Sequence, residues 1–262
     1  MDRSEAFVMS LVLAVHGSAL PGAGDTMGRL CDTVRARSGE RPVVGHLDHQ
    51  LPSLADALSR TDTDGGSVVV PLLLGDGYHR TVDIPAVVAE YGGAGCRLAG
   101  SLSGAAEIDT ALAERLGAAE AADEGGPVDA IVCAAAGSSR PGGNDGALLA
   151  ARRLAIRRPG TPVVTAYCSA AEPTVPEALA GLRAEGHRRI GIVAHLLAPG
   201  RFTRALDTAE AAFVTAPLAD HPAVADLVVR RYREVTDVRD PGASVARGRG
   251  RAGARRFAHA AA

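Results

Sequence analysis

The sequence predicts an α/β fold made of two similar parallel-sheet halves. Short apolar runs rich in Val and Leu alternate with stretches whose apolar residues recur every three or four positions. That alternation is typical of a mainly parallel sheet covered by helices. The pattern also restarts midway, because LAVHGSALPG at 13–22 resembles CAAAGSSRPG at 133–142. We therefore expect an internal repeat of two βα units, at 7–122 and 128–235.

The first half is expected to open with a strand at 7–15, FVMSLVLAV. An almost unbroken apolar run suits a strand that is buried on both faces. A helix should follow, with one apolar face made by Met27, Leu30, Cys31 and Val34. The remaining strands of this half are expected at 43–48, 67–74 and 96–100, and the remaining helices from 52, from 83 and over 105–122.

Asp83 is expected to cap the third of these helices, with Pro85 in its first turn. The segment before it, GDGYHRTV at 75–82, is expected to be a loop. For the whole chain we expect a first half at 1–123, a second half at 124–235 and a disordered tail at 236–262. The tail is rich in Arg, Gly and Ala, and contact of its run RGRGRAGARR with a polyanion is the alternative.

Composition excludes several functional classes for this chain of 262 residues. A net charge of -2 gives no general attraction to nucleic acid or to an anionic membrane. The sequence contains neither a P-loop nor a GxGxxG after a strand, so nothing in it indicates ATP, nicotinamide or flavin. It has no apolar stretch near the length of a membrane span and no signal peptide pattern. Four cysteines without CxxC spacing read as reduced thiols, and we expect a cytoplasmic protein.

Two histidines follow predicted strands of the first half. His16 ends the first strand and His79 follows the third, while Asp48 lies near the end of the second. The carboxyl ends of parallel strands share one edge of the sheet, where ligands bind. Imidazole and carboxylate together suit first-row divalent metals. Each residue alone also has a structural explanation, as a hydrogen-bonded histidine at a strand end or a loop carboxylate.

The repeat favours the functional explanation. The second half has Ala136 in place of His16 and Phe202 in place of His79, and Cys168 aligns with Asp48. The polar set is thus confined to one half.

The other histidines are expected to be structural or exposed. His46 and His49 flank Asp48, and strand alternation puts His46 on the side of Asp48 and His49 opposite, unless the strand has already ended. His195 lies inside a predicted strand and reads as a core histidine with satisfied hydrogen bonds. Solvent exposure is expected for His187, His221 and His259.

Arginines near the expected cleft are candidate ligands for substrate carboxylates, because the guanidinium group binds carboxylate through two parallel hydrogen bonds. Ser18 could donate a hydrogen bond there or cap the next helix. His16-Gly17 could form an oxyanion hole, but no G-x-S-x-G motif accompanies it. The arginines concerned are Arg80, Arg140, Arg201 and Arg204, each of which could equally be a solvated surface charge.

Three segments together resemble a known family. They are HGS at 16–18, Asp48 four residues before Pro52-Ser53, and PLLLGDGYHRTVDIP at 71–85. Over about residues 8–235 the chain resembles the CbiX/SirB group of sirohydrochlorin chelatases, the class II tetrapyrrole chelatases, in their long two-repeat form. The family usually has Glu at the position of Asp48.

The resemblance implies two flavodoxin-like halves related by a pseudo-twofold axis, with a tetrapyrrole cleft between them. It implies ATP-independent insertion of Fe²⁺ into sirohydrochlorin, in siroheme biosynthesis. The alternatives are a cobaltochelatase of cobalamin biosynthesis and a non-catalytic carrier of metal or tetrapyrrole on the same fold. His16, His79 and Asp48 would bind the metal and carry the catalysis, with Ser18 and the four arginines at the substrate. No cofactor beyond the substrate metal is implied, and a monomer could complete the cleft.

Overall fold

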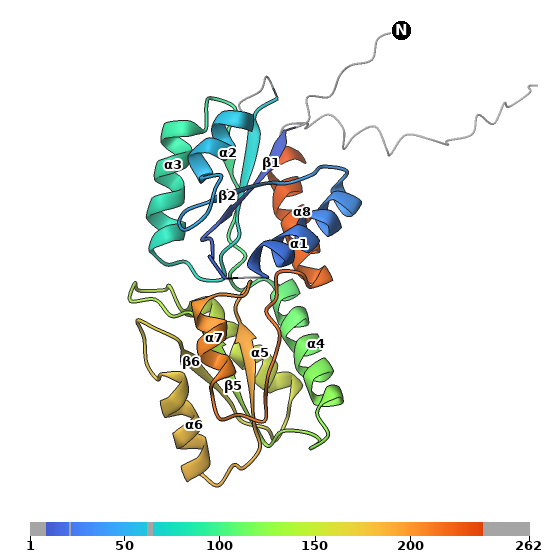
Figure 1. The fold of residues 1–262 in the computed structure, drawn as a ribbon, viewed down its shortest axis with the longest axis vertical. Helices are drawn as coiled ribbons and strands as arrows, with labels where there is room; N and C mark the ends of the chain where they lie inside the picture. Colours follow the sequence, from blue (N-terminus) through green and yellow to red (C-terminus); the bar gives the residue numbers. More distant parts are fainter. Residues whose placement is uncertain (1–8, 21, 62–64, 238–262) are drawn as a thin grey trace, which may run out of the picture.

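A computed structural model describes residues 9–20, 22–61 and 65–237. It contains two four-stranded parallel sheets, one in each half, and the halves are stacked along the long axis of the molecule (Figure 1). The strand orders are β2-β1-β3-β4 and β6-β5-β7-β8. The prediction of two similar parallel α/β halves is therefore confirmed. The predicted tail at 236–262 lies almost entirely outside the described residues.

The elements of the first half are β1 (Ser10–Val15), α1 (Ala23–Ser38), β2 (Val43–His46), α2 (Leu54–Thr61), β3 (Ser67–Pro71), the π-helical turn η1 (His79–Asp83), α3 (Ile84–Tyr91), β4 (Arg97–Leu98) and α4 (Ala106–Ala122). Those of the second half are β5 (Ala130–Ala135), α5 (Asp145–Arg157), β6 (Val163–Tyr167), α6 (Val175–Ala184), β7 (Ile190–His195), α7 (Arg201–Asp207), β8 (Phe213–Val214) and α8 (Pro222–Thr236).

Strand β1 is buried on both faces, as its apolar run predicts. Leu11 and Leu13 belong to the core shared with α1 and α8, whereas Val12 and Ala14 belong to the core shared with α2 and α3. Residues that alternate along a strand point to opposite faces of the sheet. A strand covered on both sides therefore needs apolar residues at every position, not at every second one.

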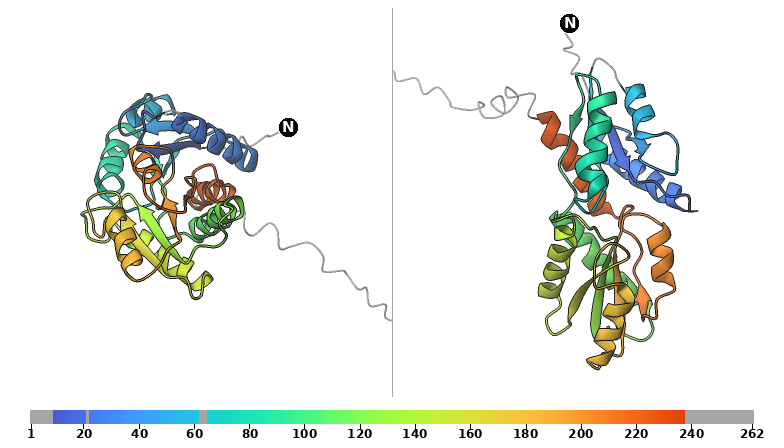
Figure 2. Two further views of the ribbon diagram at one scale, coloured as in Figure 1. Left: turned by 60° about the horizontal axis from the view of Figure 1, so that its bottom comes forward. Right: turned by 90° about the vertical axis from the view of Figure 1, so that its left-hand side faces the viewer.

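Each half receives a helix from the other. The last helix, α8, packs on α1 and β3 of the first half, and α4 packs on α5 and β7 of the second. The left view in Figure 2 shows α8 in red beside α4 in green. The phenol of Tyr232 in α8 donates a hydrogen bond to the carbonyl of Met9, at 2.6 Å. In the sequence, the second repeat begins between α4 and β5. In the structure, the last helix of each repeat packs on the other half.

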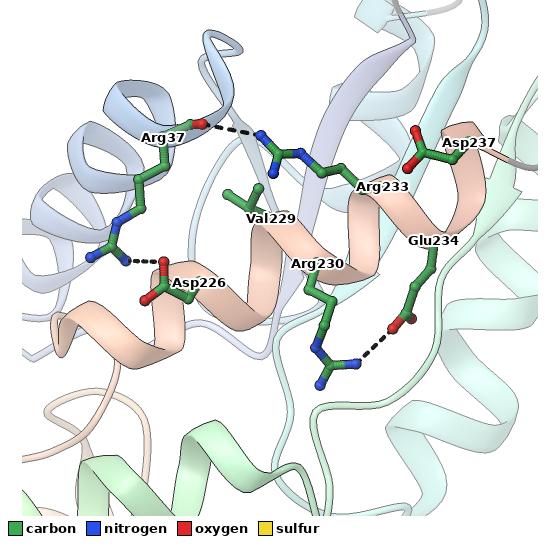
Figure 3. Close-up of a pocket in the computed structure, with 7 residues that line it drawn as sticks. All are labelled: Arg37, Asp226, Val229, Arg230, Arg233, Glu234 and Asp237. Atoms are coloured by element: carbon green, nitrogen blue, oxygen red, sulfur yellow. Dashed lines mark hydrogen bonds and ion pairs between the residues drawn. The ribbon is translucent and has the colours of Figure 1, made fainter. Parts of the chain in front are cut away.

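Charged side chains line a pocket between α1 and α8 (Figure 3). Arg37 forms an ion pair with Asp226 at 2.9 Å, and Arg230 forms another with Glu234 at 2.6 Å. Arg233 donates to the backbone carbonyl of Arg37 at 3.3 Å. Arg37 lies in the last turn of α1, at the opposite end of that helix from His16. The pocket therefore belongs to the helix pair and contains none of the candidate site residues.

Two expectations about histidines are wrong. His221 is buried and not exposed. Its Nδ1 accepts a hydrogen bond from the backbone N–H of Ala223 at the start of α8, and its Nε2 lies 3.1 Å from Oε2 of Glu114. His195 is buried as expected, but its Nε2 has no hydrogen-bond partner among the described residues. His259 lies outside the described residues.

Replacing Leu227 with alanine should weaken the whole molecule, because this fully buried side chain lies in α8 within the core of the first half. Truncation of a buried Leu costs about 2–5 kcal/mol of unfolding free energy. Ile156→Ala is the control, because Ile156 is 79% exposed on α5 and should change stability by less than about 0.5 kcal/mol. Urea unfolding followed by circular dichroism measures both; equal losses would contradict the packing of α8.

His195→Leu should flatten the dependence of stability on pH, since Leu72 occupies the equivalent position of the first half. Burial lowers the pKa of His195 from 6.5 to about 4. The unfolded chain therefore takes up this proton first as pH falls below 6.5, and the folded state loses stability down to about pH 4. Between pH 7.5 and 5 this amounts to about 2 kcal/mol. Urea unfolding at both pH values should show a smaller difference in the variant; an unchanged difference would contradict the assignment.

Candidate metal and tetrapyrrole site

The candidate residues gather where the strand order reverses. β1 has β2 on one side and β3 on the other, and ligands bind outside the carboxyl ends of the strands at such a point. His16 directly follows β1, Asp48 lies two residues after β2, and His79 opens η1 beyond β3. In Figure 1 this edge of the upper sheet faces the lower half. Three adjacent strands thus deliver the three residues to one place.

The structure brings His16, Asp48 and His79 together, as the sequence predicts. The Nδ1 of His16 lies 3.7 Å from Oδ2 of Asp48, and the ring centroids of His16 and His79 are 4.7 Å apart. His49 joins them, with its ring centroid 5.7 Å from that of His16. The side chains of His16, Asp48 and His79 are 40–53% exposed, so solvent and a ligand can reach them.

The loop after β2 decides which side chains face the site. The amides of Leu47 and Asp48 donate to the carbonyls of Val15 and His16, both at 2.9 Å. β2 itself ends at His46, so strand alternation no longer applies to the residues after it. The chain then reverses at His49, which has the left-handed φ of 65°.

The two histidines that flank Asp48 therefore lie in different surroundings. Both the amide and Nδ1 of His46 lie 3.0 Å from the carbonyl of Pro52, which keeps this ring with the loop backbone. His49 instead lies beside His16. Strand alternation would place His46 on the side of Asp48, but this holds only if the strand continues past His46. Because β2 ends at His46, the alternation does not apply.

Gly17 lets the loop cross the end of β1. Its φ is +99°, and a Cβ there would lie 2.0 Å from the carbonyl oxygen of Asp48. Only glycine fits such an approach and adopts this conformation without strain. Ser18 is held next to it, because its amide donates to Oε1 of Gln50 at 3.0 Å.

Asp83 orients His79 and does not cap a helix. The Nδ1 of His79 lies 2.6 Å from Oδ2 of Asp83, and Asp83 makes no capping hydrogen bond with its side chain. The expected loop becomes a π-helical turn from His79, continuous with α3. A hydrogen bond from Nδ1 to a carboxylate fixes the ring orientation and leaves Nε2 as the nitrogen that can bind a metal.

His16 is held in its neutral form near neutral pH. Partial burial lowers the pKa of this imidazole, and the neighbouring His79 lowers it further. Its own backbone and Asp48 oppose the shift without reversing it. Neutral imidazole is the form that binds a metal or accepts a proton.

Arg140 reaches the site from the second half. Its guanidinium carbon lies 5.6 Å from the ring centroid of Tyr78, the residue before His79. Ser18 faces the second half, since its hydroxyl lies 3.6 Å from where a Cβ of Gly200 would be. Arg201 lies over the ring of Phe202 at 5.0 Å.

The remaining predicted arginines are less directly placed. Arg80, in η1, approaches Asp76 at 4.0 Å, and its Nε is buried without a partner among the described residues. Arg204 is exposed on α7. Arg140 is thus the predicted arginine with a contact beside His79.

The second half repeats the backbone without the two histidines and the carboxylate. The amide of Ser169 donates to the carbonyl of Ala136 at 3.0 Å, as that of Asp48 does to His16. Ser169, not Cys168, is therefore the counterpart of Asp48. Ala170 repeats the left-handed conformation of His49, with φ of 58°. Phe202 stands in place of His79, because the hydrogen bond from Arg204 to Gly200 repeats that from Thr81 to Gly77.

Comparison with protein families matches this chain to CbiX over residues 10–119 and 130–235. A sirohydrochlorin cobaltochelatase of Methanocaldococcus jannaschii is 34% identical over 80 residues, 29% of this chain and 55% of that protein. The cobaltochelatase of Methanococcoides burtonii is 30% identical over 81 residues, 29% of this chain and 62% of that protein. These relatives are thus matched over little more than half their length.

Solved structures share the fold. SirB from Bacillus subtilis with Fe³⁺ has a TM-score of 0.72 at 21% identity, covering 90% of this chain and 98% of SirB. The sirohydrochlorin chelatase SirB from Bacillus subtilis subspecies spizizenii in complex with cobalt has a TM-score of 0.67 at 20% identity, with the same coverage. Both halves of the chain therefore take part in the likeness.

Replacing Gly17 with alanine should disrupt the site and the fold around it. Alanine at φ +99° pays the cost of a left-handed conformation, about 1–2 kcal/mol, and its Cβ also collides with the carbonyl of Asp48. Gly160→Ala is the matched control, because Gly160 has φ +84° and open space around it. Thermal unfolding should show a clearly larger loss for Gly17→Ala. Equal losses would mean that the loop does not cross β1 in this way.

Proposed function

Because the chain belongs to the CbiX family, we propose that it inserts a divalent metal into sirohydrochlorin without ATP, with Fe²⁺ as the metal and siroheme as the end of the pathway. The observation that carries the proposal is the cluster of His16, Asp48 and His79 at the switch point of the first sheet. The cluster supplies two imidazoles and one carboxylate, a ligand set that leaves coordination positions open for exchange.

The cluster has the chemistry to receive the metal. The contact between Nδ1 of His79 and Asp83 directs Nε2 of that ring to the metal, and the lowered pKa of His16 favours the neutral form of the other ring. Neutral nitrogens and the Asp48 carboxylate replace waters of the incoming ion. The ion is thereby held near the macrocycle with fewer waters left to lose.

Insertion also needs a proton acceptor. The macrocycle binds the metal as a dianion, so two pyrrole N–H protons leave as the metal enters, and the charge of the product balances. An imidazole that is not holding the metal, or the carboxylate of Asp48, can take these protons in turn and pass them to solvent. The exposure of these side chains gives the protons a way out.

The second half would hold the tetrapyrrole. Sirohydrochlorin carries many carboxylates, and Arg140 brings a cation to the edge of the first-half site. We assign Arg80, Arg201, Arg204 and Ser18 to the same rim. A single chain supplies both sides of this cleft, so we propose that the protein acts as a monomer, in the cytoplasm. Within the described residues, no helix has the length and apolar character to cross a membrane.

Cobalt is the second candidate metal. The matched relatives are named sirohydrochlorin cobaltochelatases, and one of the similar solved structures is in complex with cobalt. Histidine and carboxylate ligands accept both ions, and metal availability often decides between them. A non-catalytic carrier would bind metal or tetrapyrrole stoichiometrically, with no turnover.

Removing both histidines should abolish insertion. We expect His16→Ala with His79→Ala to lower the rate to the non-enzymatic background, because the metal loses both nitrogen ligands. The measurement is anaerobic absorbance of sirohydrochlorin with Fe²⁺ and, in parallel, Co²⁺. His187→Ala is the control, since His187 lies beside Asp129 on the second half. Full activity of the double variant would refute the site, and stoichiometric binding without turnover by the unaltered chain would support a carrier.

A further inference from the structure

We propose that His49 is a metal ligand of this chain. With His16 and Asp48 it forms a three-residue set that captures the divalent ion before the tetrapyrrole takes it. The proposal deepens the proposed function, since it concerns the metal that the reaction would consume. It adds a ligand to the cluster of His16, Asp48 and His79.

The geometry of the three side chains fits one ion. Each of His16, Asp48 and His49 offers one ligand atom, and these atoms all lie within 4.8 Å of one another. Bonds of about 2.0–2.2 Å from an ion to imidazole nitrogen and carboxylate oxygen place its ligand atoms roughly 3–4 Å apart. Small rotations of exposed side chains close that difference. All three are exposed, so the ion can arrive from solvent.

The backbone holds His49 in place. The preceding residue, Asp48, is pinned to His16 by its amide, and the following residue, Gln50, is pinned to Ser18 by its side chain. The left-handed φ of His49 then turns the chain between these two anchors. Metal sites need ligands on supported backbone, and both neighbours of His49 are tied to the segment that carries His16.

The second half is an internal control for the imidazole. Ala170 adopts the same left-handed conformation at the equivalent position, so the fold needs the turn and not the histidine. Within the described residues the ring of His49 makes no hydrogen bond, whereas the ring of His46 is bonded to Pro52. His49 is also absent from the second half together with His16, Asp48 and His79. Its imidazole is therefore unused by the architecture and placed with the ligands.

His49 and His79 approach His16 from different elements, the loop after β2 and the turn η1. An ion held by His16, Asp48 and His49 would therefore be close to His79 as well. This arrangement predicts that His49 governs metal affinity more than substrate affinity. Loss of His49 should raise KM for the metal and leave KM for the tetrapyrrole unchanged.

The test is Co²⁺ titration of the full chain without tetrapyrrole, followed by calorimetry and by the visible absorption of the bound ion. His49→Ala should weaken binding about tenfold or more, since loss even of a residue that only supports a metal ligand costs about 10–100-fold in affinity. His187→Ala is the matched control, because the Nδ1 of His187 lies 3.8 Å from Oδ1 of Asp129, so it too is a histidine beside a carboxylate. It should leave the affinity unchanged. Urea unfolding should be the same for all three proteins.

A second variant tests ligation directly. His49→Cys places a thiolate at the same position, and a thiolate bound to Co²⁺ gives an intense near-ultraviolet charge-transfer band that the unaltered chain should lack. The proposal is overturned if His49→Ala binds Co²⁺ as tightly as the unaltered chain, if His49→Cys shows no such band, or if the unaltered chain binds no Co²⁺.

The two proposals fail in different ways. Co²⁺ binding that depends on His49, in a chain that inserts no metal, would support the ligand and refute the chelatase. Insertion that needs His16 and His79, with Co²⁺ affinity and KM for the metal both indifferent to His49, would support the chelatase and refute the ligand.

Discussion

The hydrogen bond from the amide of Asp48 to the carbonyl of His16 is the constraint on which the site depends. This hydrogen bond continues the pairing of β1 and β2 past the ends of both strands, and it holds the loop after β2 across the end of β1. Gly17 makes the crossing possible, because any side chain there would collide with the Asp48 carbonyl. The same bond sets the spacing of His16 and Asp48 and turns His49 toward them. A single backbone contact thus places several side chains that strand periodicity alone would separate.

The two halves show that this contact belongs to the fold and the ligands do not. Gly137 likewise has a positive φ, of +91°, and a Cβ on it would lie 1.8 Å from the carbonyl oxygen of Ser169. The second half thus repeats the crossing, with Ala136 and Ser169 in place of His16 and Asp48. Because the same backbone contact forms with Ala136 and Ser169, the fold itself does not require His16 and Asp48 at these positions. The two halves therefore contribute different side chains to this place: the imidazoles and the carboxylate come from the first half, and Arg140 comes from the second.

Much of the fold can be predicted from the sequence, because apolar runs indicate buried strands and the internal repeat indicates two similar halves. The strands, the order of elements and the meeting of His16, Asp48 and His79 all follow from parallel strands that end at one edge. The contribution of His49 does not, since β2 stops at His46 and no local pattern marks that end. The Asp83 contact was also missed, because Asp followed by Ile-Pro is the usual signature of a helix start. The π-helical turn before α3 overrides it. The sequence repeat aligns Cys168 with Asp48, whereas the hydrogen bonds pair Ser169 with Asp48, because residue patterns alone do not locate a one-residue insertion.

The exchange of helices explains why one chain can hold such an asymmetric site. The core of the first half includes Leu227 and Val228 from α8, and it continues through α4 to Ile131 and Val193 of the second half. The shared core fixes one sheet edge against the other, because sliding the halves apart would expose apolar surface from both. Arg140 and Tyr78 lie on loops of different halves, and the shared core keeps these loops next to each other. The second half lacks counterparts of His16, Asp48 and His79, but in the proposed function it remains necessary, because it forms the wall opposite the first-half cluster.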